Sequence, residues 1–179
     1  MNAQLRNRTR RRTLEPQATA LLAGPASDPT AAEPLTDLCF QLIDAGFMHL
    51  AIRIGERAVS CANAGSSLGA QAWACLRFGE ALSWRRDERA VPQLELAVVK
   101  LRAVLATDPD NPTYLRDVGI GLGTLGNAYR DQGEFGRAVE ALTESLTHHR
   151  AVLATDPDNQ KWANEFKQVE RDLRDAEEG

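Results

Sequence analysis

Apolar residues recur along this chain at the three- and four-residue spacing of amphipathic helices. The first clear set is Leu35, Leu38, Leu42 and Ile43. These positions share one side of a helix, so the pattern predicts a helix that buries this face. Pro34 suits the first helical position. Gly46 interrupts the pattern, and a second helix is expected to run to about Ala62.

The same spacing predicts five further helices, over 67–85, 88–106, 112–132, 134–154 and 160–177. The connections at 107–111 and 155–159 have the same sequence, TDPDN. Their proline stops the preceding helix, and their final asparagine can cap the next one. No segment alternates with the period of two that is typical of a strand. The pattern therefore predicts an all-α fold.

Part of this pattern is an internal repeat. The string RAVLATDPDN occurs at 102–111 and again at 150–159, which are 48 residues apart. At the same offset, Arg-Ala-Val at 89–91 recurs at 137–139. Self-similarity at a fixed period marks a repeat protein. Stacked repeats build extended surfaces, and such surfaces are typical of proteins that bind other molecules.

One repeat carries a recognisable motif, made of Leu122, Leu125, Gly126, Tyr129, Ala138 and Leu142. The order and spacing resemble the tetratricopeptide repeat, whose period is about 34 residues. The extra residues of the longer period divide evenly between the two helices of the unit, so that each helix is about two turns longer than in the family. The resemblance implies a right-handed tetratricopeptide-like α-solenoid of about three antiparallel helical hairpins, closed by a C-terminal capping helix.

The motif also predicts contacts inside the hairpin. Gly126 and Ala138 are small where the two helices are expected to cross closely. Gly133 suits the left-handed backbone that ends the first helix. An earlier unit fits less well, because Pro92 falls where its second helix should already be running. That helix is expected either to start near Val91 or to be kinked.

In this family the first helices of successive hairpins line a concave groove. The resemblance implies that the groove residues are Arg116, Ile120, Asn127, Arg130, Asn164, Gln168 and Arg171. Asn127 matches the position where some members hold the C-terminal carboxylate of a peptide. Gly123 stands where a lysine is expected, and Gln168 and Asp172 stand where basic residues are expected. We therefore expect a groove for another kind of peptide or protein segment.

Residues 1–34 differ from the rest of the chain. They contain four prolines and no helical periodicity, so we expect a disordered leader before a repeat domain over 35–179. The leader holds a dense basic cluster, Arg6, Arg8, Arg10, Arg11 and Arg12. This cluster is interpreted as a solvated tail, an electrostatic contact for an acidic partner, lipid or nucleic acid, or a transit peptide. The remainder has 16 basic and 22 acidic residues, which makes it a poor candidate for non-specific nucleic-acid binding.

No residue pattern indicates a cofactor, a metal site or a catalytic centre. The three cysteines, Cys39, Cys61 and Cys75, have an irregular spacing that disfavours disulfides and zinc. Their side chains are expected to be buried, and the protein is expected in a reducing, cytoplasmic compartment. His148 and His149 are adjacent and point about 100° apart on a helix, so they would not converge on one metal. No apolar run reaches the roughly 20 residues of a membrane helix.

Together these patterns predict a non-catalytic module that binds a peptide or a partner protein through its concave face. The alternative is a self-assembling structural subunit, a homo-oligomer joined through apolar faces at the ends of the array. A third class is an enzyme that uses the polar stripe near Asn127 and Arg171. The Ala- and Arg-rich, Lys-poor composition is compatible with a bacterial source.

Overall fold

The computed structural model describes the backbone of residues 3–179 and the side chains of residues 12–179. Within this part of the chain the fold is all-α, with eight α-helices, one short 3-10 helix and no strand. The helices form two compact units, unit 1 up to Ala90 and unit 2 from Val91. The repeat domain expected over 35–179 stays a prediction.

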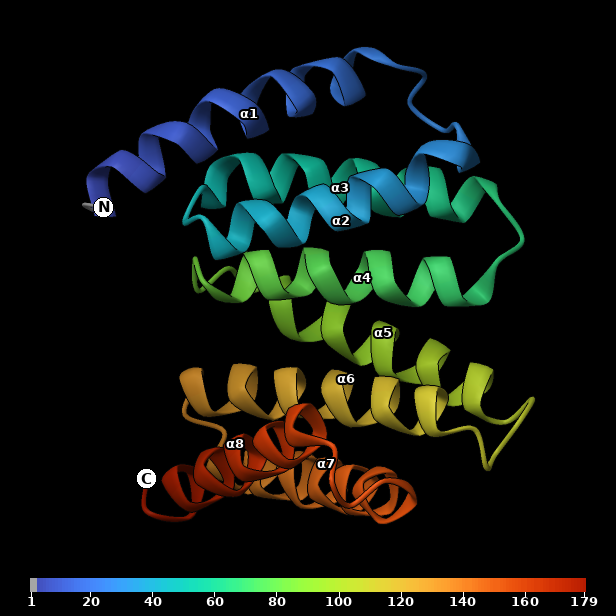
Figure 1. The fold of residues 1–179 in the computed structure, drawn as a ribbon, viewed down its shortest axis with the longest axis vertical. Helices are drawn as coiled ribbons and strands as arrows, with labels where there is room; N and C mark the ends of the chain where they lie inside the picture. The colour runs from blue at the N-terminus through green and yellow to red at the C-terminus, as the bar shows by residue number, and fades with distance from the viewer. Residues whose placement is uncertain (1–2) are drawn as a thin grey trace. The chain divides into compact units, whose positions relative to one another are not determined.

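Unit 1 contains four helices and the 3-10 turn: α1 (Ala3–Ala23), η1 (Pro29–Ala31), α2 (Ala32–Asp44), α3 (Met48–Ala64) and α4 (Leu68–Ser83). Helices α2 and α3 form an antiparallel hairpin, and α4 packs against both of them (Figure 1). The turn of the hairpin uses Gly46 at φ 79°, a backbone conformation that favours glycine. Leu35, Leu42 and Ile54 are fully buried between the helices.

The N-terminal segment differs from the disordered leader expected over 1–34, because it folds as α1. Leu14 and Ala18 of α1 are buried. Arg57 on α3 donates hydrogen bonds to the carbonyl oxygens of Leu22 and Gly24, at 3.3 and 2.9 Å, where α1 ends. A cation at a helix C-terminus satisfies carbonyls that have no partner within the helix. The hydrophobic pattern of residues 1–34 does not indicate this long-range contact.

Most of the basic cluster lies outside the described side chains. Nothing in the structure therefore tests the roles considered for Arg6, Arg8, Arg10 and Arg11. The side chain of Arg12 is described, and it is exposed.

The start of α2 also differs from the prediction. Asp28 accepts a hydrogen bond from the Thr30 backbone N–H at 2.9 Å, and Pro29 opens the 3-10 turn that leads directly into α2. The helix therefore begins at Ala32, and Pro34 lies in its first turn rather than at its first position. Proline is tolerated there because the first backbone N–H groups have no intrahelical partner.

Unit 2 contains α5 (Ala90–Leu105), which begins at the boundary, and then α6 (Pro112–Asp131), α7 (Phe135–Thr155) and α8 (Gln160–Glu177). From α4 onward every helix end lies within two residues of its predicted position. Pro92 falls in the first turn of α5, so the helix begins near Val91 as one alternative predicted. The predicted caps form, because the side-chain oxygens of Asn111 and Asn159 accept hydrogen bonds from the first turns of α6 and α8.

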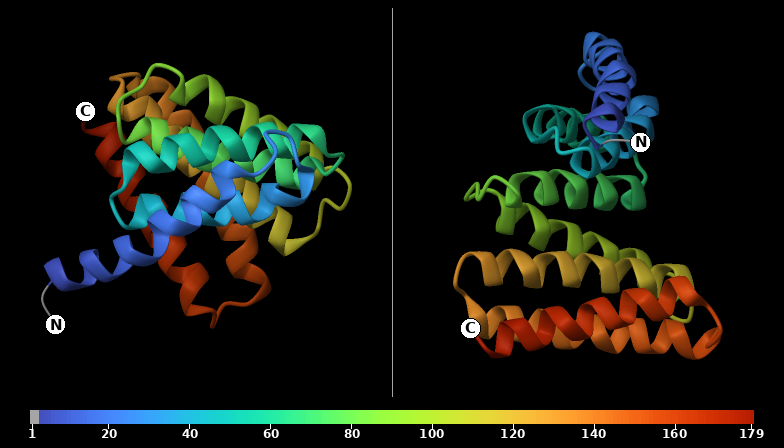
Figure 2. Two further views of the ribbon diagram at one scale, coloured as in Figure 1. Left: turned by 90° about the horizontal axis from the view of Figure 1, so that it is seen from above. Right: turned by 60° about the vertical axis from the view of Figure 1, so that its left-hand side comes forward.

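Helices α6 and α7 form the long antiparallel hairpin that the motif predicted, with 20 and 21 residues (Figure 2). Gly133 ends the first helix at φ 79°, as expected. The close crossing is confirmed: a Cβ on Gly126 would lie 3.3 Å from the Ala138 carbonyl oxygen and 2.6 Å from Leu142 Cγ. Helix α8 packs on α7 and buries Val169 and Ala176, as a capping helix should.

Candidate functional site

The predicted groove residues of α6 lie along one partly exposed stripe. Arg116, Ile120, Asn127 and Arg130 are all half-buried, whereas Asn164, Gln168 and Arg171 on α8 are exposed. The structure brings the two helices together through these polar side chains. Most of the α6 stripe contacts acidic residues of α8, namely Glu165, Asp172 and Asp175.

The strongest of these contacts joins Arg116 to Glu165. The Arg116 guanidinium donates to both carboxylate oxygens, with Nε–Oε2 at 2.8 Å and Nη2–Oε1 at 2.5 Å. Burial opposes the ionisation of Glu165, but the hydrogen bonds and charge of Arg116 outweigh it, so the pKa of Glu165 lies below its usual value. The bidentate geometry fixes the orientation of both side chains.

Two weaker contacts continue the row. The Asn127 side-chain amide donates to Asp172 Oδ2 at 3.0 Å, and Arg130 Nη1 lies 3.8 Å from Asp175 Oδ2. Asn127 Oδ1 and Arg130 Nη1 are buried without a hydrogen-bond partner among the described residues. On α8, Gln168 hydrogen-bonds to Asp172, and Arg171 donates to Gln168. Most hydrogen-bonding groups of the stripe are therefore paired within the chain, and one acceptor and one donor lack a partner among the described residues.

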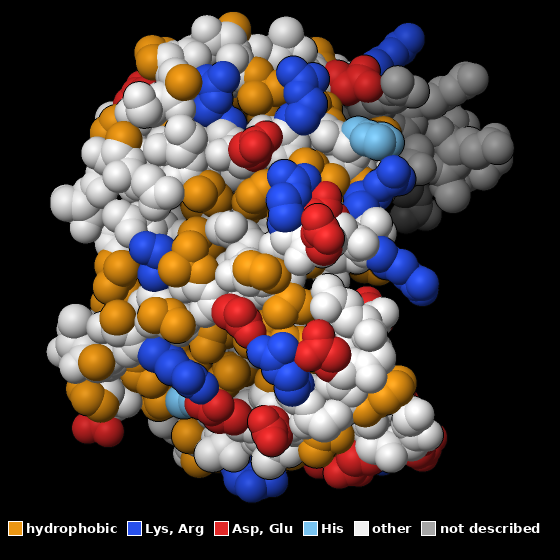
Figure 3. Space-filling view, turned by 180° about the vertical axis from the view of Figure 1, so that it is seen from behind, with side chains coloured by type: hydrophobic (Ala, Val, Ile, Leu, Met, Phe, Trp, Pro, Cys, Tyr) orange, Lys and Arg blue, Asp and Glu red, His pale blue; other side chains and the backbone are white. Residues whose placement is uncertain are grey.

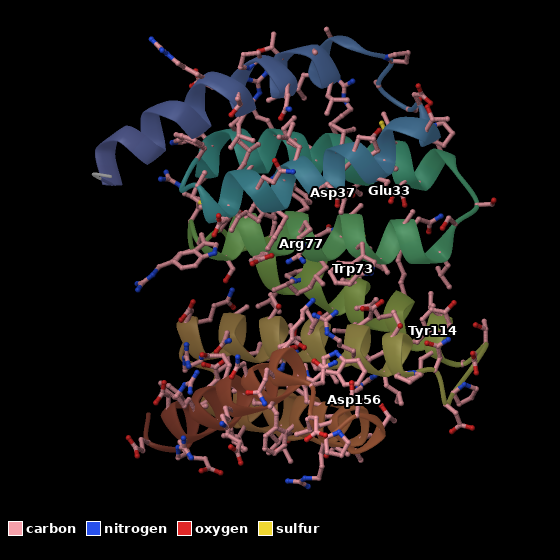
Figure 4. The ribbon with its side chains drawn as sticks, viewed as in Figure 1. Glu33, Asp37, Trp73, Arg77, Tyr114 and Asp156 are labelled. Carbon is pink, nitrogen blue, oxygen red and sulfur yellow. The ribbon has the colours of Figure 1, made fainter. Side chains whose placement is uncertain are left out.

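A second surface, which sequence reasoning missed, lies in unit 1. A groove of about 490 Å³ runs between α2 and α4. Figure 4 labels four of its residues, with Glu33 and Asp37 on α2 and Trp73 and Arg77 on α4. Phe40 completes the row on α2, and its side chain is 47% exposed. We call this surface the α2–α4 groove.

One end of the α2–α4 groove is aromatic and holds a fixed cation. The guanidinium carbon of Arg77 lies 4.3 Å from the Phe40 ring centroid and 5.0 Å from that of Trp73. Arg77 Nη1 also binds Glu80 Oε2 at 2.7 Å. The charge of Arg77 is therefore balanced by Glu80, and cation–π contacts hold its side chain against both rings.

The other end of the groove is acidic. Glu33 and Asp37 are exposed and lie one helical turn apart on α2. Within the described residues neither carboxylate has an ion-pair partner. Because Arg77 is already neutralised, these two carboxylates give the groove its net negative charge. The groove thus offers an apolar aromatic platform next to an anionic rim.

The thiol of Cys39, which precedes Phe40 in the chain, is buried and donates hydrogen bonds to the carbonyl oxygens of Ala51 and Arg77. Burial, reinforced by the Glu80 carboxylate, raises the pKa of Cys39 to about 12, so it stays a neutral thiol. In the part of the chain that the structure describes, no three His, Cys, Asp or Glu side chains gather as a metal site would require.

Several smaller predictions can be compared directly with the structure. Cys39, Cys61 and Cys75 are buried thiols that form no disulfide, as expected. His149 is buried and His148 is half-buried. Over the described residues, no helix combines the length and apolarity that a bilayer crossing demands.

The sequence carried a signal for the α2–α4 groove. Glu33, Asp37 and Phe40 are spaced by four and three residues, and Trp73 and Arg77 by four, so each set marks one helix face. The pairing of these two faces is a tertiary contact, and nothing in the spacing reveals it.

No family model and no curated protein matches the chain. Solved structures resemble it at low identity, among them the following three. The first TPR of Spaghetti (RPAP3), bound to HSP90 peptide SRMEEVD, is 15% identical with a TM-score of 0.43, and the match covers 84% of this chain and 99% of that one. A MamA structure is 17% identical with a TM-score of 0.45 and coverages of 93% and 90%.

MamA from residue 41 onward, from Desulfovibrio magneticus RS-1, is 19% identical with a TM-score of 0.38 and coverages of 99% and 97%. At such TM-scores these structures support no conclusion about ligands or assembly. The tetratricopeptide-like character of the fold follows from the chain itself, through its internal repeat and the packing of the α6–α7 hairpin.

Proposed function

We propose that this protein is a non-catalytic interaction module that binds a short segment of a partner protein in the α2–α4 groove. The observation that carries the proposal is the aromatic platform of Phe40 and Trp73 beside the unpaired carboxylates of Glu33 and Asp37. Apolar surfaces with a few placed charges are typical of peptide-binding sites, because burial supplies affinity and charge sets orientation.

The dimensions of the groove define the segment. Glu33 and Phe40 are seven residues apart, which corresponds to about 10.5 Å along a helix. An extended peptide covers that distance with about three residues. We therefore infer a segment with a lysine or arginine near Glu33 and Asp37, and an aromatic or large aliphatic residue about three positions away, on the Phe40–Trp73 platform.

The polar stripe on α6 and α8 is a second candidate for partner contact. Its favouring observation is the pair of polar atoms without a hydrogen-bond partner among the described residues, Asn127 Oδ1 and Arg130 Nη1. The internal contact between Arg116 and Glu165 counts against it, since a partner would have to compete with a bidentate ion pair. A cytoplasmic location stays a prediction from the cysteines.

Selection from a displayed library of random 12-residue peptides on the full chain tests the proposal. We expect enriched peptides to carry a basic and an aromatic or large aliphatic residue about three positions apart. The double variant Glu33→Lys/Asp37→Lys should weaken the binding of these peptides by at least about tenfold. Both side chains are exposed, so the variant should fold normally.

The matched control is Glu56→Lys/Glu88→Lys. It makes the same change in net charge at two exposed positions of unit 1 that do not line the groove. Peptide binding should be unaffected by it. Equal binding to both double variants, or a selection that enriches no basic peptides, would rule out the α2–α4 groove. If Ala substitutions at Arg116, Asn127, Arg130 and Arg171 alone abolished binding, the stripe on α6 and α8 would be the site.

A further inference from the structure

Helices α5 and α7 are joined by two ion pairs that form a regular charge pattern. Arg137 Nη2 lies 2.6 Å from Glu95 Oε1, and Arg102 Nη2 lies 2.6 Å from Glu144 Oε2. Glu95 and Arg102 are seven residues apart on α5, and Arg137 and Glu144 are seven apart on α7. The two helices are therefore parallel, and the four charges form a square on which opposite signs alternate.

Apolar side chains are exposed inside and beside this square. Val99 is 62% exposed and Leu96 is 44% exposed. Together with Pro92 and Ala103 they form a stripe spaced by four, three and four residues, all of them exposed. A stripe with this narrow spacing is the seam that one helix presents to another in a coiled coil.

A hollow of about 320 Å³ lies between the two ion pairs, over Val98 and Leu122. The space-filling view from behind shows apolar side chains bordered by acidic and basic ones in its lower half (Figure 3). We call this region, defined by the four charges and the α5 stripe, the α5–α7 surface.

We propose that the α5–α7 surface binds a second copy of this chain, with α5 packed antiparallel on α5 of the partner about a two-fold axis. Such an axis is perpendicular to the helices, so it exchanges the two ends of the square. Glu95 then faces Arg102 of the second copy, and Arg137 faces its Glu144. Each of the four charges of the square meets its opposite, so the square is complementary to itself, as a two-fold interface requires.

The apolar stripe is complementary in the same arrangement. Val99 lies close to the axis and meets its own counterpart. Leu96 meets the small Ala103 of the other copy, and Ala103 meets Leu96 in return. The internal ion pairs stay intact and become four-charge clusters at each end of the interface. The inference is independent of the α2–α4 groove, because it uses residues of unit 2 alone.

The first test is the mass of the full chain across a concentration range, by sedimentation or light scattering. We expect the mass to rise from 19.6 kDa toward twice that value. Val99→Asp should keep the chain monomeric, whereas Trp84→Asp should dimerise as the parent does. Trp84 is a suitable control because it is also an exposed apolar residue, 68% exposed, outside the α5–α7 surface.

The second test swaps charges while it preserves the internal ion pairs. Arg102→Glu/Glu144→Arg reverses one pair, so that like charges face each other across the axis. We expect the dissociation constant of the dimer to rise at least about tenfold. Adding Glu95→Arg/Arg137→Glu to that variant reverses the second pair as well. The alternating square is then rebuilt, and dimerisation should return.

Each outcome decides the matter. A parent chain that stays at its monomer mass up to millimolar concentration overturns the proposal. So does a Val99→Asp variant that dimerises normally. If the single-pair swap has no effect, α5 does not lie on α5 of the partner, because packing of α5 on the partner's α7 would tolerate that swap. Circular dichroism should show the same helix content for all variants, since every substituted side chain in these two tests is at least partly exposed.

Discussion

Leu142 on α7 lies directly over Gly126 on α6. A Cβ at Gly126 would come within 2.6 Å of the Leu142 Cγ atom, closer than side-chain carbons approach in folded proteins. The contact allows the two long helices to cross closely, and it explains why a residue that weakens helices is kept in the middle of α6.

Gly126→Ala should therefore destabilise the protein, although alanine is the better helix former. We expect a loss of about 1–3 kcal/mol from overpacking, measured by urea unfolding. Gly136→Ala on α7 is the control, because a Cβ there would meet nothing within 4 Å. This control should be neutral or slightly stabilising. A stable Gly126→Ala variant would contradict the close crossing.

The bidentate pair of Arg116 and Glu165 should contribute more than the pairs at the surface. Its side chains are only 20% and 25% exposed, whereas those of Arg102 and Glu144 are 49% and 42% exposed. A double-mutant cycle with alanine should give a coupling of about 1 kcal/mol for the first pair and less than about 0.5 kcal/mol for the second. Both double-mutant cycles should be measured at a protein concentration at which the chain is monomeric. Equal couplings would mean that burial does not strengthen the α6–α8 contact.

Stability should fall at mildly acidic pH because of His149. Burial lowers its pKa, helped by Arg116 and His148 and opposed by Glu165. Burial also lowers the pKa of His148, with Glu144 opposing and Arg102 assisting. A histidine whose folded pKa is lowered binds its proton more readily in the unfolded chain. Full stability is therefore present above about pH 6.5 and is lost as the pH falls through the folded pKa.

The slope should reach at most about 1.4 kcal/mol per pH unit for each histidine. His149→Gln should flatten the dependence between pH 7 and 5 in urea unfolding followed by circular dichroism. His49→Gln, at an exposed position, should leave the slope of the parent chain unchanged. A slope that survives in His149→Gln would assign the effect to other groups.

Arg57 should determine whether α1 stays docked on unit 1. Arg57→Ala removes its hydrogen bonds to Leu22, Gly24 and Pro25, and should cost about 1–3 kcal/mol of local stability. Hydrogen exchange should then accelerate over 12–23 while α2 and α3 keep their protection. Arg53→Ala, at an exposed position of the same helix, should change neither. Unaltered exchange in α1 would show that Leu14 and Ala18 suffice to hold it.

The polar stripe shows what the repeat length leaves open. It relates equivalent positions of successive repeats, whereas the contacts across the stripe join Arg116 to Glu165 and Asn127 to Asp172. The offset is 49 residues in one case and 45 in the other. Because α6 and α8 belong to successive repeats, their lateral register depends on how the two helices cross, and the repeat length alone does not determine it.

Helix positions, caps and the packing of the α6–α7 hairpin could all be read from the sequence, because each depends on residues near one another along the chain. Apolar spacing, Asn111 before Pro112, and the small residues at the crossing act locally. The ordering of α1 by Arg57, the pairing of α2 with α4, and the charge square of α5 and α7 were decided only in three dimensions. Those contacts join residues 30 to 40 or more positions apart, and their formation depends on helix packing that no local pattern encodes.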